Sequence, residues 1–200
     1  MGSLIEIYAF LYLELRMSLM ASIFSLTDHE VFLLTCADNE GRKSGMIATW
    51  VLPASLLPDT PRLMFLSSPL NYTHELMLAK GSFVVHLLAS DQFGMVPQFG
   101  LHSGRAQDKF DNIDMVCSNG GHPIVQGTCG WAECKVAANY DMGERVMVVG
   151  EVTSQKCFDN KKALTKRMAF SSLAPEVRNQ LAEKHKSLGE SSRKLYRKFL

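Results

Sequence analysis

Short apolar runs separated by turn signals fill the chain from residue 31 to residue 153 and predict strands. The expected strands are 31–37, 44–52, 62–67, 82–88, 131–140 and 145–153, with a small edge strand at 124–125. Polar stretches that contain a glycine, at 38–44 and 141–144, indicate hairpin turns. Six or more strands with hairpin-like links predict a mainly β fold, a β-barrel with short helices, rather than a parallel sheet.

Helical patterns interrupt the strands twice and replace them after residue 160. Residues 71–81 predict a short helix, which Asn71 or Ser68 can cap and Gly81 ends. Residues 91–99 predict a second short helix or helical turn. We therefore divide the chain into an apolar N-terminal extension (1–27), a barrel domain (28–156) and a basic C-terminal helical segment (157–200).

Charge separates the C-terminal segment from the rest. Residues 1–160 hold 10 basic and 17 acidic side chains, whereas residues 161–200 hold 11 basic and 3 acidic ones. The stretch Arg193–Leu200 interleaves basic and apolar residues at helical spacing, which is typical of a helix that packs on one face and is solvated on the other. A barrel that binds nucleic acid through this stretch is the alternative, and it requires a steeply salt-dependent affinity. We expect no nucleic-acid partner.

The N-terminal extension is strongly apolar, but Glu6, Glu14 and Arg16 interrupt it. That interruption argues against a membrane anchor or a signal peptide and favours a segment that packs on a partner surface. Met17 and Met20 are alternative starts. The five cysteines are odd in number and include no C-x-x-C pair, so neither a disulfide framework nor a zinc site is indicated, and a reduced, cytoplasmic setting fits best.

Familiar catalytic motifs are absent from the sequence. It contains no nucleophile elbow, Walker phosphate-binding loop, H-E-x-x-H motif or G-x-G-x-x-G motif. The six histidines are scattered, and none has a second ligand type at helical metal-binding spacing. We expect no bound metal.

The strand expected at 44–52 carries small residues where a packed sheet would prefer branched ones. Gly45, Ala48 and Thr49 lie along it, and Trp50 follows. One interpretation is a poor core strand. The other is a surface that lets a flat ring approach the backbone, because small side chains leave that approach open.

The order of the segments adds information that no single motif carries. In order, the chain has Gly45-Met46, a proline-rich link from Pro53 to Pro61, Asn71 to Leu76, Gly81 to Leu88, Lys109-Phe110, Gly121-His122-Pro123, Glu133 to Val136 and Gly143 to Val152. Over residues 28–155 this order resembles the flavin reductase-like domain, the FMN-binding split barrel family. The resemblance implies a split barrel followed by a helical segment, a homodimer, and bound FMN, or FAD in its place.

The resemblance also implies which residues bind the flavin. The first strand would contact the ring through Met46, Ile47, Ala48, Thr49 and Trp50. The turn into the first helix would hold the phosphate through Ser67, Ser68, Asn71, Thr73 and His74. Further contacts would come from Gln98 and Phe99 near the ribityl chain and from Lys109 and Phe110, which in the family often reach the flavin across the dimer interface.

Each of these assignments has a structural alternative. Trp50 could be a core or dimer-interface aromatic. Asn71 or Thr73 could simply cap the helix, although capping and anion binding can coexist. Phe110 could be an ordinary core aromatic.

One position departs from the family pattern. The last hairpin reads Gly143-Glu144-Arg145, where the family usually has a histidine beside the nicotinamide. An arginine stays charged and cannot titrate like an imidazole, but it can pair with a phosphate. Arg145 is therefore our candidate catalytic residue, and we expect slow NADH oxidation and better use of NADPH.

The resemblance implies an oxidoreductase that moves hydride from NAD(P)H to flavin N5, with the cofactor supplying the reactivity. The alternative is a flavin-binding electron carrier of the flavoredoxin kind, or a binding protein without NAD(P)H turnover.

Overall fold

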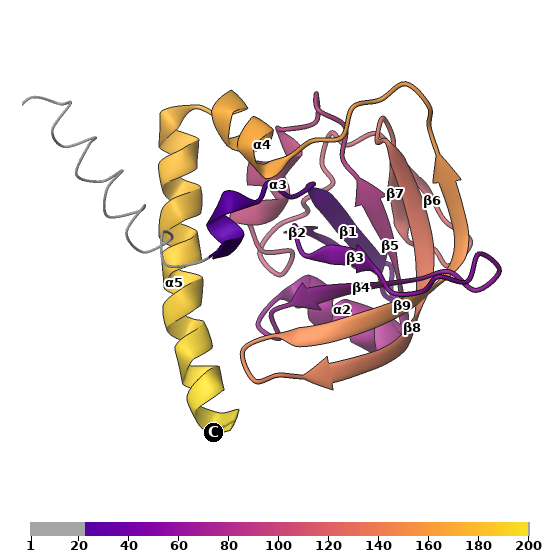
Figure 1. Ribbon diagram of the computed structural model, residues 1–200, viewed down its shortest axis with the longest axis horizontal. Coiled ribbons are helices and arrows are strands. Elements are labelled where there is room, and N and C mark those ends of the chain that lie inside the picture. The colour runs from indigo at the N-terminus through magenta and orange to yellow at the C-terminus, as the bar shows by residue number, and fades with distance from the viewer. Residues whose placement is uncertain (1–22, 200) are drawn as a thin grey trace, which may run out of the picture.

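A curled antiparallel sheet forms the centre of the molecule (Figure 1). The computed structural model describes residues 23–199, so the expectations for residues 1–22 lie outside the described residues. The seven strands of the sheet follow the spatial order β2-β1-β5-β8-β9-β4-β3. Their bounds are β1 Phe32–Ala37, β2 Lys43–Ala48, β3 Val51–Pro53, β4 Arg62–Ser67, β5 Ser82–Leu87, β8 Gly130–Asp141 and β9 Val146–Cys157. The prediction of a mainly β fold is confirmed.

The edges of this sheet belong to strands that are consecutive in the chain. β2 pairs with β1, and β3 pairs with β4 at the opposite end of the order. Only Thr49 and Trp50 separate them, so the sheet must curl until its edges approach each other, which produces the split barrel. The prediction of one continuous strand over 44–52 is wrong, because the chain changes partner strand at this junction.

A second, small sheet lies beside the barrel. It pairs β6, Met115–Cys117, with β7, Pro123–Val125. The sequence predicted the second of these strands as an edge strand and missed the first. All three residues of β7 are buried.

Helices cover the sheet and one side of the barrel. They are the 3₁₀ helix η1 Ile23–Leu26, α2 Tyr72–Lys80, α3 Met95–Leu101, α4 Lys166–Ser172 and α5 Pro175–Phe199. The predicted helix at 71–81 is confirmed with both of its ends. Asn71 accepts a hydrogen bond from the backbone N–H of Thr73 (3.0 Å), and Gly81 ends the helix with a left-handed φ of 74°.

Buried apolar side chains form two clusters, and strand β1 contributes to both. Leu34 packs with Phe65, Phe83 and Met77 inside the barrel, beneath α2. Its neighbour Leu33 packs into the second cluster, which includes side chains of α3 and α4. Successive residues of a strand point to opposite faces, so the continuous apolar run of β1 reflects burial on both sides.

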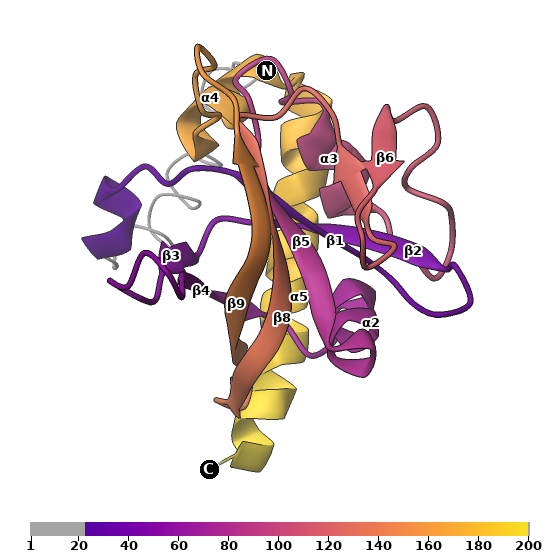
Figure 2. The same ribbon diagram turned by 90° about the vertical axis from the view of Figure 1, so that its right-hand side faces the viewer.

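Helix α5 runs along one side of the barrel and passes behind β8 and β9 in the turned view (Figures 1 and 2). Lys184 fixes it to α3, because its ammonium donates to the carbonyl of Leu101 (2.7 Å) at the end of that helix. Within residues 23–199, no helix combines the length and the apolar character that crossing a membrane requires. The division into three segments stays a prediction.

Candidate functional site

Three strand ends meet at one corner of the barrel. The carbonyl of Trp50, at the β2–β3 junction, accepts a hydrogen bond from the N–H of Leu66 in β4 (3.3 Å). The next residue, Ser67, is paired with Val146 at the start of β9. The register therefore brings the junction, the end of β4 and Arg145 together, although they are far apart in the sequence.

Trp50 and Arg145 are neighbours at this corner. Trp50 is 49% exposed, so it is available to a ligand or a partner chain. The guanidinium carbon of Arg145 lies 5.9 Å from the ring centroid, within the range of a cation–π contact. Arg145 also forms an ion pair with Glu144 (3.0 Å), and its Nη1 lies 3.5 Å from the hydroxyl of Ser192 on α5.

The turn from β4 into α2 divides its polar side chains between surface and interior. Ser68 and Asn71 are half-buried, whereas Ser67 and His74 are buried. The Ser67 hydroxyl lies 2.7 Å from Nδ1 of His74. Burial lowers the pKa of His74, which favours the neutral imidazole.

Thr73 is also turned inward. Its side chain is 1% exposed, and its hydroxyl bonds to that of Ser44 on β2 (2.8 Å). This bond ties the first turn of α2 to the β2 strand. At the helix N-terminus, Ser68 and Asn71 are thus the more accessible of the predicted phosphate-binding side chains.

Packing gives a reason for the glycine in β2. A Cβ at Gly45 would lie 2.8 Å from the Phe99 ring, so the glycine makes room for that aromatic. Met46 and Ala48 are buried in the barrel core, and Ile47 packs against the second cluster. The side chains of these three residues thus pack within the chain, whereas Trp50 is exposed.

The remaining predicted contacts lie together beside β2. Lys109 is buried and donates to the carbonyls of Gly45 (2.8 Å) and Phe99 (3.0 Å). Burial, with a smaller contribution from Lys184, lowers the pKa of Lys109 to about 8. The Phe99 and Phe110 rings pack edge to face at 5.2 Å in the second core cluster.

Gln98 completes this group. Its amide nitrogen donates to the carbonyl of Lys109 (2.9 Å). Gln98 thus ties the two ends of the 98–110 segment together, while Lys109 and Phe99 contact Gly45 of β2. Their contacts within the chain are those of a supporting layer for the strand.

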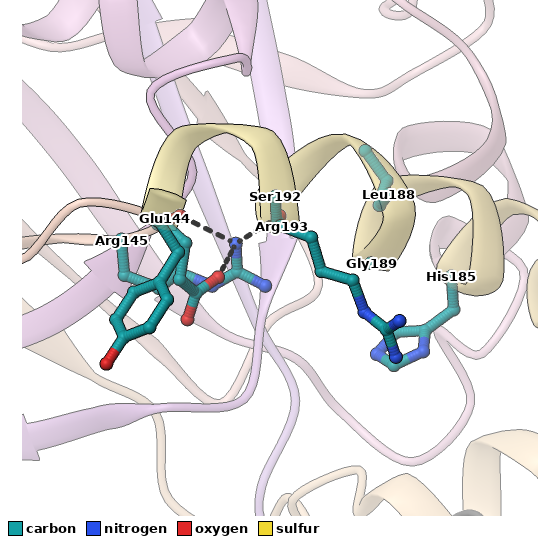
Figure 3. Close-up of a pocket in the computed structure, with 8 residues that line it drawn as sticks. Glu144, Arg145, His185, Leu188, Gly189, Ser192 and Arg193 are labelled. Atoms are coloured by element: carbon teal, nitrogen blue, oxygen red, sulfur yellow. Dashed lines mark hydrogen bonds and ion pairs between the residues drawn. The ribbon is translucent and has the colours of Figure 1, made fainter. Parts of the chain in front are cut away.

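A cleft of about 260 Å³ opens between the β8–β9 turn and α5 (Figure 3). Its lining residues are Glu144, Arg145, His185, Leu188, Gly189, Ser192, Arg193 and Tyr196. The sequence predicted a site role for Arg145 and placed Arg193 and Tyr196 only in the basic stretch at the C-terminal end. The signal that could have found the others is their helical spacing, which places 185, 189, 192 and 196 on one face of α5.

Among residues 23–199, no three histidine, cysteine, aspartate or glutamate side chains gather in a way that could hold a metal ion.

Comparison with protein families identifies a match over most of the chain. The family described as "Flavin reductase like domain" matches residues 24–174. This range begins in η1 and ends after α4, so it contains the barrel and the corner but not α5.

Individual relatives agree with the family match. The chain is 27% identical to a flavin reductase of Pseudomonas putida over 67% of this chain and 76% of that protein. It is 31% identical to the FMN reductase (NADH) SmoA of Agrobacterium fabrum, over 50% of this chain and 55% of that protein. For the second relative, the alignment thus spans about half of the protein's own length.

A solved structure has the same fold. Nitrilotriacetate monooxygenase component B from Mycobacterium thermoresistibile superimposes with a TM-score of 0.66 and 24% identity, covering 76% of this chain and 83% of that one.

Proposed function

The chain belongs to the flavin reductase-like domain family, and from this premise we propose that it is a flavin-dependent oxidoreductase that uses NAD(P)H and binds FMN, with FAD as the alternative flavin. A bound flavin accepts hydride at N5 and passes the electrons on. The observation that carries the proposal is the convergence of Trp50, the β4–α2 turn and Arg145 at one corner of a barrel that the family match spans.

The residues of the corner suit a flat, polar ligand. The half-exposed indole of Trp50 offers a face for stacking, and Thr49 keeps a hydroxyl beside it. Ser68 and Asn71 stand at the N-terminus of α2, where free N–H groups and the helix dipole favour a phosphate. We assign Ser67, Thr73 and His74 a positioning role, since their polar atoms are buried and bonded to each other or to Ser44.

The other predicted residues support the strand on which the ring would lie. Met46, Ile47 and Ala48 provide its backbone, while their side chains pack into the two clusters. Lys109 holds the Gly45 carbonyl from the side. Arg145 is assigned to the nucleotide co-substrate because it carries a permanent positive charge next to the indole.

The proposed function is tested in two steps. The purified protein is titrated with FMN, and binding is measured as quenching of the flavin fluorescence. The oxidation of NADPH and of NADH is then assayed. Saturable binding with nucleotide oxidation supports the oxidoreductase. Saturable binding without oxidation favours the electron carrier or binding protein. Absence of saturable FMN binding would contradict both the oxidoreductase and the flavin-binding alternative.

Asn71→Ala is expected to weaken the binding of FMN by about 1.5–3 kcal/mol, which is a roughly 10- to 150-fold loss of affinity, because a hydrogen bond to a charged phosphate is lost. Riboflavin lacks the phosphate, so its affinity should change little. Calorimetric titration of both ligands against both proteins gives the comparison. Equal losses for FMN and riboflavin would show that Asn71 serves only as a helix cap.

We also propose a homodimer. The β2–β3 junction, the edge strand β3 and the loop after it expose large apolar side chains, which are Trp50, Leu52, Leu56 and Leu57. Several exposed large apolar side chains on neighbouring segments are typical of a protein interface. Light scattering at micromolar concentration should give twice the monomer mass of 22.3 kDa, and a monomer with bound flavin would contradict the proposal.

A further inference from the structure

The α5 wall of the cleft carries polar and basic side chains together with the apolar Leu188. His185, Gly189, Ser192 and Tyr196 recur at intervals of three or four residues, with Arg193 beside Ser192. Ser192 is 6% exposed, and its hydroxyl faces Arg145 across the cleft. The helix and the β8–β9 turn thus contribute polar groups to the same space (Figure 3).

The charges of the cleft do not balance. Arg145 is paired with Glu144. Arg193 has no ion pair within the described part of the chain, and its side chain extends toward His185 (Figure 3). The cleft is therefore lined by two guanidinium groups and a single carboxylate. A surplus of positive charge in a partly enclosed space favours an anion, and guanidinium groups match the geometry of a phosphate.

The size of the cleft limits what it can hold. Its volume of about 260 Å³ falls just below the range of roughly 300–1,000 Å³ that is typical for complete small-molecule sites. It can therefore take one phosphorylated part of a larger molecule. The rest of that molecule can extend toward Trp50, because Arg145 lines the cleft and also contacts the indole ring.

We propose that this cleft binds the phosphate monoester of a nucleotide through Arg193 and Arg145. Two nucleotides of the proposed function carry such a group, NADPH on its 2′-oxygen and FMN on its 5′-oxygen. NADPH fits better, because the FMN phosphate is assigned to the α2 N-terminus. The inference rests on the proposed function and extends it, since it makes α5, which lies outside the family match, a determinant of nucleotide choice.

The experiment compares Arg193→Ala with the matched control Lys194→Ala. Both remove one positive charge from exposed, adjacent positions of α5, but only Arg193 lines the cleft. The probe is 2′,5′-adenosine diphosphate, which carries the 2′-phosphate, compared with 5′-adenosine monophosphate, which lacks it. Calorimetry on the FMN-loaded full chain gives dissociation constants without relying on activity, and KM values for NADPH and NADH complete the set.

Arg193→Ala should raise the dissociation constant of 2′,5′-adenosine diphosphate and the KM for NADPH about tenfold, the scale of one hydrogen bond to a charged group. Lys194→Ala should change neither. Arg145→His should also reduce the preference for NADPH over NADH, because the permanent charge is lost.

Other outcomes are decisive as well. If Arg193→Ala instead weakens the binding of FMN but not that of riboflavin, the cleft binds the FMN phosphate, and the assignment to NADPH is overturned. Equal effects of the two α5 variants, or no preference of the unmodified protein for the 2′-phosphate, overturn the inference entirely. If the unmodified protein binds 2′,5′-adenosine diphosphate but no flavin, the phosphate site in the cleft is supported and the proposed flavin-dependent function is contradicted.

Discussion

Replacing Lys109 with methionine is expected to lower the free energy of unfolding by about 2–4 kcal/mol, because two buried carbonyl acceptors lose their donor. The ammonium of Lys109 bonds to the carbonyl of Gly45, on the edge strand β2, and to that of Phe99, in the last turn of α3. Methionine keeps the length of the stem but donates nothing. Urea denaturation at pH 7 measures the loss.

Lys43→Met is the matched control for this substitution. Lys43 lies near the same aromatic pair, with its ammonium 5.5 Å from the Phe110 ring centroid, but its side chain is 31% exposed and its ion pair with Asp108 spans 3.7 Å. A surface pair of this kind is worth at most about 1 kcal/mol. Equal destabilisation by the two variants would show that the two carbonyls do not depend on Lys109.

Acidification from pH 7 to pH 4.5 is expected to cost about 2–3 kcal/mol of stability through His86 alone. The imidazole is fully buried, Nδ1 lies 2.9 Å from the Leu33 carbonyl, and Nε2 accepts from the N–H of Val125 (3.1 Å). These two bonds require the neutral ring with its proton on Nδ1, and they attach β7 to the barrel.

The direction of the effect follows from the two pKa values. Burial lowers the pKa of His86 from 6.5 to about 4 in the folded protein. Between these values the unfolded chain binds a proton that the folded chain does not, so stability is fully present above pH 6.5 and is lost as the pH falls toward 4. Burial lowers the pKa of His74 and His122 as well, and their contributions have the same sign.

His86→Gln isolates the contribution of this one residue. A glutamine amide can donate to Leu33 and accept from Val125, but it does not titrate. Denaturation midpoints measured between pH 7 and pH 4.5 should therefore fall less steeply in the variant, by about the same 2–3 kcal/mol. Parallel curves for the two proteins would assign the acid sensitivity to other groups.

Elements whose signals are local were predictable from the sequence. The helix α2 begins and ends where a capping asparagine and a left-handed glycine stand, and both rules involve only neighbouring residues. Strand β4 was found with its exact bounds, because an apolar run lies between a proline-rich link and a turn. The order of such segments was also sufficient to indicate the family.

Features that depend on distant partners could not be predicted. Nothing near Gly45 reveals that Phe99 fills the space above it. The break after Ala48 arises because β3 pairs with β4 and not with β1. The cleft was missed since its walls, the β8–β9 turn and α5, are separated by many residues, and the basic stripe of α5 by itself indicated only a solvated face.

The junction of Thr49 and Trp50 has a kinetic consequence. Hairpins β1–β2 and β3–β4 contain short-range pairings that can form early, but the junction ties them to opposite edges of one sheet. Neither hairpin can reach its final place until β5, β8 and β9 have formed between them, and β4 must then pair Ser67 with the distant Val146. Pairings between residues so far apart in the sequence give the fold a high contact order. The chain loses the entropy of closing these long loops before it gains the stabilising contacts, so folding is slow. The last step of barrel assembly is therefore concerted, and Trp50 sits where its fluorescence would report that step.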